Sequence, residues 1–209
     1  MNLVDHLSIK LSLLYQTLYF FKKHLAMILG LGFIAAFGRV IQLGGFGQVS
    51  HRVTIFLEVV VEFVRLSIFL YVLGLASFKK GALRIKQLIT NKASRKLYGR
   101  VALQKISKQW GEILLNFSVF LGIAWAINYL VDLLAYQTCL YLTLKKNEIL
   151  NQTSSEWTII LFFKNISVIP FTLTFEALFL LWIVNKFRSD KRAKAARVTS
   201  PQPTWVLWW

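Results

Sequence analysis

The sequence has few of the residues that build catalytic and metal centres. Among 209 residues there are one cysteine, three histidines and nine acidic residues. A single cysteine, Cys139, excludes a disulfide within the chain and a thiolate metal site, and its apolar surroundings predict a small buried side chain. The histidines lack the HxxxH and HExxH spacings of metal-binding helices, and no serine lies in a GxSxG motif. We therefore expect no enzyme activity, metal or cofactor.

Proline is also scarce, with three in the whole chain, and the hydrophobic residues that make up 56% of it are concentrated in four blocks. These blocks are residues 25–44, 53–78, 113–141 and 157–184. A helix needs about 20 mainly apolar residues to cross the hydrocarbon core of a bilayer. The sequence thus predicts an all-α integral membrane protein, with a four-transmembrane-helix bundle over residues 25–184.

Lysines and arginines predict the direction of the four spans. Nineteen of the 25 lie before the first block, between the second and third, or after the fourth, whereas only Arg52, Lys145 and Lys146 lie on the opposite side. Short cytoplasmic loops are enriched in lysine and arginine. This asymmetry predicts that both termini and the middle loop are cytoplasmic.

A cleavable signal peptide is the alternative interpretation of the first block. Ala36-Phe37-Gly38 would be an acceptable cleavage site with small residues at the required spacing. The 24 residues that precede the block are long for the charged region of a signal peptide, and the apolar run continues beyond Gly38. Both features favour a retained span.

Residues 1–24 have a helical apolar stripe, formed by Leu3, Leu7, Leu11, Leu14, Leu18 and Phe21. Spacings of three and four residues place these side chains on one helix face. An amphipathic helix of this kind can lie at the membrane interface. Packing against the protein itself or against a partner explains the stripe equally well, so both alternatives stay open here.

The cytoplasmic loop over residues 79–110 has ten positive charges. We expect it to be largely helical, with breaks at Gly81 and Gly99, and to contact anionic lipids on the cytoplasmic face. Nucleic acid is a weaker alternative, because topology already accounts for the charge. The predicted lipid-contacting residues are Lys79, Lys80, Arg84, Lys86, Arg95, Lys96 and Arg100.

The C-terminal segment, residues 185–209, is first basic and then rich in proline and tryptophan. Trp205, Trp208 and Trp209 lie within its last five residues. Tryptophan is enriched both at membrane interfaces and in protein–protein contacts. We expect this cytoplasmic tail to be an anchor on one of those two surfaces.

Charged residues lie inside the apolar blocks, where a charge costs at least about 2.5–3.5 kcal/mol at the bilayer centre and normally has a partner. Depths counted at 1.5 Å per residue place six of them in the outer half of the membrane, while Glu176 lies deep toward the cytoplasmic side. The predicted intramembrane network consists of Arg39, Glu58, Glu62, Arg65, Asp132 and Lys164.

Spacing predicts part of the pairing in this network. Glu58, Glu62 and Arg65 are separated by four and three residues, so they share one helix face, and Glu62 can pair with Arg65. Lys164 needs an acid from another helix, for which Glu58, Glu62 and Asp132 are the candidates. Asn128 and Asn165 could join the network, and Pro170 predicts a kink in the fourth span.

Two classes of function fit these features. The first is a non-enzymatic integral membrane subunit that contributes helices and a basic cytoplasmic surface to a larger complex, with other membrane subunits or further copies of itself as partners. The second is an ion- or proton-coupled transporter or channel that uses Glu58, Glu62, Asp132 and Lys164. Near-equal numbers of acids and bases favour structural pairing. We expect residence in a bacterial inner membrane or an equivalent energy-transducing membrane.

Overall fold

The computed structural model describes residues 11–184, and every regular element in that range is a helix. This confirms the all-helical class. The helices are α2 (Ser12–Lys23), α3 (Leu25–Gln42), α4 (His51–Leu73), α5 (Phe78–Thr90), α6 (Lys92–Gln137), α7 (Leu140–Lys146), α8 (Trp157–Ile166) and α9 (Val168–Ile183).

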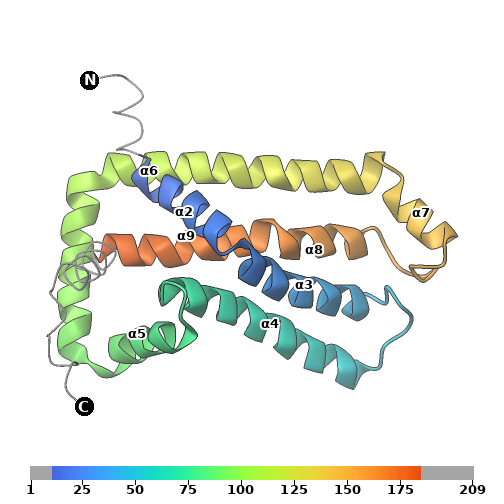
Figure 1. Cartoon of the computed structure of the whole chain (residues 1–209), viewed down its shortest axis with the longest axis horizontal. Coiled ribbons are helices and arrows are strands. Elements are labelled where there is room, and N and C mark those ends of the chain that lie inside the picture. Colours follow the sequence, from blue (N-terminus) through green and yellow to red (C-terminus); the bar gives the residue numbers. More distant parts are fainter. Residues whose placement is uncertain (1–10, 185–209) are drawn as a thin grey trace, which may run out of the picture.

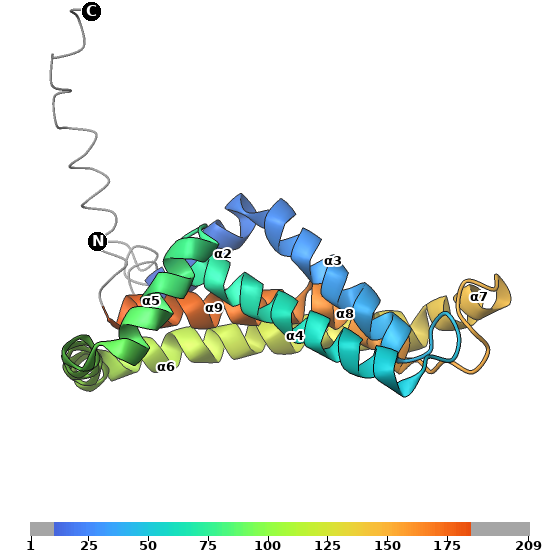
Figure 2. The same ribbon diagram turned by 90° about the horizontal axis from the view of Figure 1, so that it is seen from below.

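Four long segments run side by side along the longest axis of the molecule: α3, α4, the α8–α9 pair and the second half of α6 (Figures 1 and 2). α3 packs against α4 and α8, α4 packs against α9, and α6 contacts α8 and α9. We call the end that contains α5 and residues 92–108 of α6 the basic end. The opposite end, with α7 and the loops 43–50 and 147–156, is the turn end.

Three helical segments are long and apolar enough to cross a membrane: α3, α6 and α8–α9, each with an 18-residue stretch whose mean hydropathy is 1.8, 1.8 and 1.9, respectively. A fourth is possible if α4 and α5, which meet at 88°, are counted together. The structure thus contains three to four candidate spans. The helix of the second predicted span, α4, ends at Leu73 rather than at residue 78, because the chain turns sharply into α5.

α6 differs from its prediction. α6 spans 46 residues and includes both the basic loop and the third predicted span, which are two helices that meet at a kink where Gln109 has non-helical backbone angles (φ −127°, ψ 28°). The expected break at Gly99 is wrong, because a glycine inside a helix costs only about 1 kcal/mol and need not end it. The helix of the third predicted span also ends at Gln137, short of residue 141, since Cys139 adopts a left-handed conformation (φ 52°). Cys139 is exposed at this turn, contrary to the expected buried position.

The fourth predicted span is interrupted between α8 and α9. The backbone of Ser167 (φ −109°, ψ −77°) separates the two helices. Pro170 lies one turn later, and it can neither donate a hydrogen bond to the carbonyl of Ile166 nor avoid crowding it. The predicted proline effect is therefore present, and it takes the form of a break one turn before the proline.

α2 packs against the rest of the protein. Leu13, Leu14 and Thr17 are buried against α9 and α6, whereas Leu18 of the predicted stripe is 47% exposed. One face of α2 therefore packs on the protein itself, and a position at the membrane interface stays a prediction. The first ten residues, with Leu3 and Leu7, lie outside the described range.

The main hydrophobic core lies toward the basic end. Phe120 of α6 stacks on Phe175 of α9, with ring centroids 4.0 Å apart, and on Phe171 at 5.5 Å. Side chains from α2 and α4 complete the core. A smaller cluster near the turn end consists of Val40, Tyr141, Leu150 and Ile159.

The two loops at the turn end are joined to each other. The backbone N–H of Asn151 donates to the carbonyl of Gly45 at 2.7 Å. Gly44 and Gly47 have positive φ angles of 71° and 124°, which glycine adopts without steric cost, and they lie in the turn between the first two long helices. This turn positions the charged residues at the adjoining ends of α3 and α4.

Candidate functional site

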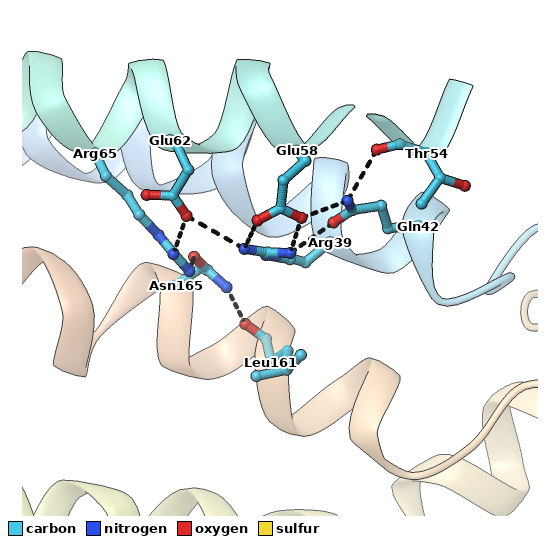
Figure 3. Close-up of polar contacts among 8 residues, drawn as sticks. All are labelled: Arg39, Gln42, Thr54, Glu58, Glu62, Arg65, Leu161 and Asn165. Carbon is cyan, nitrogen blue, oxygen red and sulfur yellow. Dashed lines mark hydrogen bonds and ion pairs between the residues drawn. The ribbon is translucent and has the colours of Figure 1, made fainter. Parts of the chain in front are cut away.

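A fork of charge-assisted hydrogen bonds joins α3 to α4 near the turn end (Figure 3). The Arg39 guanidinium donates to both carboxylate oxygens of Glu58, at 2.6 and 2.9 Å. Bidentate pairs of this kind are stronger and more directional than single hydrogen bonds. Gln42 adds a donor to Glu58 at 2.7 Å and a second to the carbonyl of Thr54 at 3.0 Å. These contacts fix the alignment of the two helices.

Glu62 extends this fork along α4 and toward α8. Its Oε1 accepts from Arg65 at 2.6 Å and from Arg39 at 3.3 Å. Arg65 then donates to the Asn165 side chain on α8 at 3.0 Å, as Figure 3 shows. Glu62 and Arg65 thus pair within one helix, as their spacing predicts. We call the group Arg39, Gln42, Glu58, Glu62, Arg65 and Asn165 the charge network; it has two positive and two negative charges.

Lys164 and Asp132 form a separate pair between α8 and α6. Their nearest nitrogen and oxygen atoms are 3.9 Å apart, which is long for a hydrogen bond. Among the three acids considered as partners for Lys164, the structure places Asp132 beside it. Asn128 does not join the pair, because its amide donates to the carbonyl of Ala124 in its own helix. The six predicted charges therefore lie in two groups.

Acids and bases in these two groups differ in exposure. The side chains of Glu58, Glu62 and Asp132 are 48%, 54% and 47% exposed. Their cationic partners are only 18–24% exposed. The charges balance in number, yet the surface of both groups presents carboxylate oxygens, which can accept further hydrogen bonds from outside the chain.

The surface around these carboxylates is apolar. Phe56, Val59 and Phe63 on α4 are 65%, 62% and 68% exposed. Glu176, on the apolar helix α9, is also exposed and has no hydrogen-bond or ion-pair partner among residues 11–184. Acidic groups thus lie at the surface of α4, α6 and α9, on helices whose remaining surface is suited to lipid or to apolar side chains.

A second candidate region is the basic surface of α5 and residues 92–108 of α6. Exposed side chains on it include Lys79, Lys80, Lys86, Arg95, Lys96 and Arg100. Arg84 is partly buried and donates to the carbonyl of Leu73 at 2.5 Å, so it also braces α5 against α4. The region therefore combines exposed cations with cations, such as Arg84, that have structural contacts.

Sequence reasoning missed several polar contacts. Gln42 joins the charge network, and the only sequence feature that could have indicated this contact is its position one turn after Arg39. Lys105 donates to the carbonyl of Trp182 at 2.6 Å and lies 3.6 Å from the centroid of its ring, which attaches the base of α6 to α9. No sequence pattern links these two residues, which are far apart in the chain. Trp205, Trp208 and Trp209 lie outside the described residues.

Within the described range, no group of three or more histidine, cysteine, aspartate or glutamate residues could hold a metal ion. Comparison with known protein families, with curated proteins and with solved structures finds no match to this chain. Function is therefore argued from the two charged regions themselves.

Proposed function

We propose that this chain is a non-enzymatic integral membrane subunit that joins a larger membrane complex through α4. Three to four candidate spans support membrane insertion. The half-exposed carboxylates of Glu58 and Glu62 support the presence of a partner subunit at α4, because a carboxylate is costly against lipid and normally faces protein or water. A neighbouring subunit with hydrogen-bond donors or cations would cover them.

Balance within the charge network supports a structural role rather than transport. Arg39 and Arg65 neutralise Glu58 and Glu62, and both arginines are mostly buried. A cation pathway would tend to leave an acid without such a partner. We infer that the network aligns α3 and α4 and presents its carboxylate face to the neighbouring subunit.

The membrane placement and its direction can be tested together. The chain should stay in the membrane fraction after alkaline carbonate extraction. A cysteine placed at Gly47 or Asn151, in a Cys139→Ser background, should react with an impermeant thiol reagent added outside intact cells. A cysteine at Ser94 should not react. Labelling of Ser94 from outside would overturn the orientation, and release by carbonate would overturn insertion.

The subunit role can be tested with a photo-crosslinking residue at Val59, between Glu58 and Glu62 on α4. Leu121 on α6 is the matched control, because its exposure, 60%, is close to that of Val59, 62%. We expect a discrete protein adduct from Val59 and only lipid adducts from Leu121. Changing both Glu58 and Glu62 to glutamine should reduce the Val59 adduct. Equal adducts from the two positions would contradict a docking face on α4, and an adduct with a second copy would make the complex a homo-oligomer.

A transporter or channel is the second candidate function, and the environment of Asp132 favours it. Its contact with Lys164 is long, and half of its side chain is exposed, so a proton or cation could reach it. The purified chain in liposomes distinguishes the two functions. If the parent chain conducts ions and the folded Asp132→Asn variant does not, the transporter function replaces the subunit proposal. Absence of flux together with the Val59 adduct would support it.

A further inference from the structure

The backbone conformation fixes a sharp turn between α4 and α5, which we call the elbow. α4 ends at Leu73 and α5 begins at Phe78, and the two helices meet at 88°. Leu75 and Ala76 have positive φ angles of 49° and 71°. A Cβ atom on Gly74 would lie 1.9 Å from the carbonyl oxygen of Ser77, so the turn closes only around a glycine here.

Gly81 holds α5 directly against α4. A Cβ atom at this position would lie 2.0 Å from the carbonyl oxygen of Leu70. The residue predicted to break a helix therefore lies inside α5 and permits backbone contact between the two helices. Arg84 braces the same junction through the carbonyl of Leu73. Both contacts fix the angle between the helices and keep the surface inside the elbow open.

An apolar groove of about 410 Å³ lies inside this elbow. Its volume is in the range of small-ligand sites. Hydrophobic side chains and aliphatic stems form nearly all of its surface. Among the described residues, the Lys86 ammonium has no hydrogen-bond or ion-pair partner. The groove is lined by Leu66 and Leu70 of α4 and by Ala82, Ile85, Lys86, Ile89 and Thr90 of α5.

Charge and apolar surface around the groove indicate the chemistry of its occupant. Residues 79–110 contain ten lysines and arginines and no acidic residue. Leu83, Leu88 and Ile89 of α5 are 48%, 41% and 67% exposed among these cations. Alternating cationic and apolar surface on a short helix suits a membrane surface with anionic headgroups, since nucleic acid would leave the apolar side chains uncovered.

We propose that the elbow groove binds one acyl chain of an anionic phospholipid, with the Lys86 ammonium against its phosphate group. Leu66 and Leu70 then contact the acyl chain from α4, and Ile85 and Ile89 contact it from α5. The 88° turn places α4 along the lipid tails when α5 lies at the headgroup level. This inference rests on the proposed membrane insertion and assigns a lipid class to the basic end.

The test is native mass spectrometry of the full chain in mild detergent, titrated with phosphatidylglycerol or phosphatidylcholine. Ala82→Trp fills the groove, and Leu83→Trp is the matched control because Leu83 is adjacent and exposed but does not line the groove. We expect Ala82→Trp to lose roughly tenfold in affinity for the most tightly bound phosphatidylglycerol, because about two methylene groups lose contact. Leu83→Trp should bind as the parent does.

The role of the ammonium is tested by Lys86→Gln, with Lys79→Gln as the control on the same helix. One charge near the surface corresponds to about fivefold in preference for phosphatidylglycerol over phosphatidylcholine. Lys86→Gln should lose that preference at the tight site, and Lys79→Gln should keep it. Equal binding by Ala82→Trp and the parent would contradict lipid binding in the groove. Equal preference for phosphatidylglycerol in the two lysine variants would contradict the contact between Lys86 and the phosphate. Release of the parent chain by carbonate would instead overturn membrane insertion.

Discussion

The two ends of the helix bundle are held together by different interactions. At the basic end, Phe120, Phe171 and Phe175 form an apolar core that α2 and α4 complete. Toward the turn end, Arg39 and Glu58 join α3 to α4 through a fork of hydrogen bonds. Apolar contact between helices is not favoured over contact with lipid tails, so close packing and polar contacts must specify the neighbours. The main packed core thus lies at one end, and the charge network lies toward the other.

This difference has a consequence for substitutions. A packed aromatic core can be damaged by removing volume, and no second substitution nearby readily restores it. A neutral charge network can be damaged by removing one partner, and removing the other partner restores the balance. Single and double substitutions at the two ends should therefore follow different patterns.

The largest expected effect is at the basic end. Phe175→Ala should reduce the free energy of unfolding by about 3–5 kcal/mol, because Phe175 is fully buried and stacks on Phe120. This change in the free energy of unfolding is measured by circular dichroism during unfolding in mixed detergent micelles. Phe63→Ala is the matched control: this phenylalanine is 68% exposed, and its loss should change stability by no more than about 0.5 kcal/mol. Equal effects would show that the aromatic cluster is not the core.

At the turn end, Arg39→Met should reduce the free energy of unfolding by about 2–3 kcal/mol, because Glu58 loses a bidentate charged partner. The double variant Arg39→Met with Glu58→Gln should recover much of that loss, measured by the same unfolding assay. Arg52→Met, at the exposed start of α4, is the control and should be nearly neutral. A double variant as unstable as the two single losses combined would exclude coupling between the two side chains.

A smaller effect is expected for the pair between α8 and α6. Lys164→Met should cost no more than about 1 kcal/mol, because the contact with Asp132 is 3.9 Å long and half of that acid is exposed. Asp132→Asn in the same background should recover the difference, whereas Glu62→Gln should not. Thermal unfolding of the four proteins provides the comparison. A loss as large as that in Arg39→Met would contradict a weak contact between Lys164 and Asp132.

The smallest expected effect concerns a polar contact at the α2–α3 junction, near the basic end. Nδ1 of His24 lies 3.0 Å from the Tyr71 hydroxyl, and burial together with the neighbouring Lys23 lowers the pKa of His24 below its ordinary value of 6.5. The unfolded chain therefore binds this proton more readily. The contribution of neutral His24 to stability is complete above pH 6.5 and is lost as the pH falls below it.

Thermal unfolding between pH 7.5 and pH 5 measures this dependence. The parent should lose stability toward low pH more steeply than His24→Gln, which has no proton to bind at this position. Tyr71→Phe serves as the control for the hydrogen bond, because it removes the hydroxyl and keeps the aromatic packing. Parallel pH profiles for the parent and His24→Gln would contradict a lowered pKa for His24.

Local signals in the sequence predict part of this architecture. Hydrophobic runs located the long helices, and spacing predicted the Glu62–Arg65 pair within α4. Lys164 had three possible acids, and only the packing of α6 against α8 places Asp132 beside it. The sequence could not reveal that Gly99 lies inside one helix while Gly81 forms a contact between two, because glycine has the same local preference in both places.

The exposure of the carboxylates was also beyond local prediction. Periodicity placed Glu58 and Glu62 on one face of α4, but the surroundings of that face depend on where α3, α8 and α6 pack. Apolar residues such as Val59 and Phe63 resemble core residues in the sequence, and they lie at the surface of α4. In a bundle suited to lipid, hydrophobicity does not distinguish the inside of the protein from its periphery.

The kink in α6 has a mechanical consequence. Its basic arm, residues 92–108, meets the helix of the candidate span at Gln109, whose backbone angles are non-helical. The arm is about 25 Å long at 1.5 Å per residue, so a rotation of about 10° at Gln109 moves its far end by about 4 Å. Lys105 fastens the arm close to this pivot through Trp182. A force on residues 92–100 would therefore act as torque on the kink at Gln109 and on the base of the candidate span.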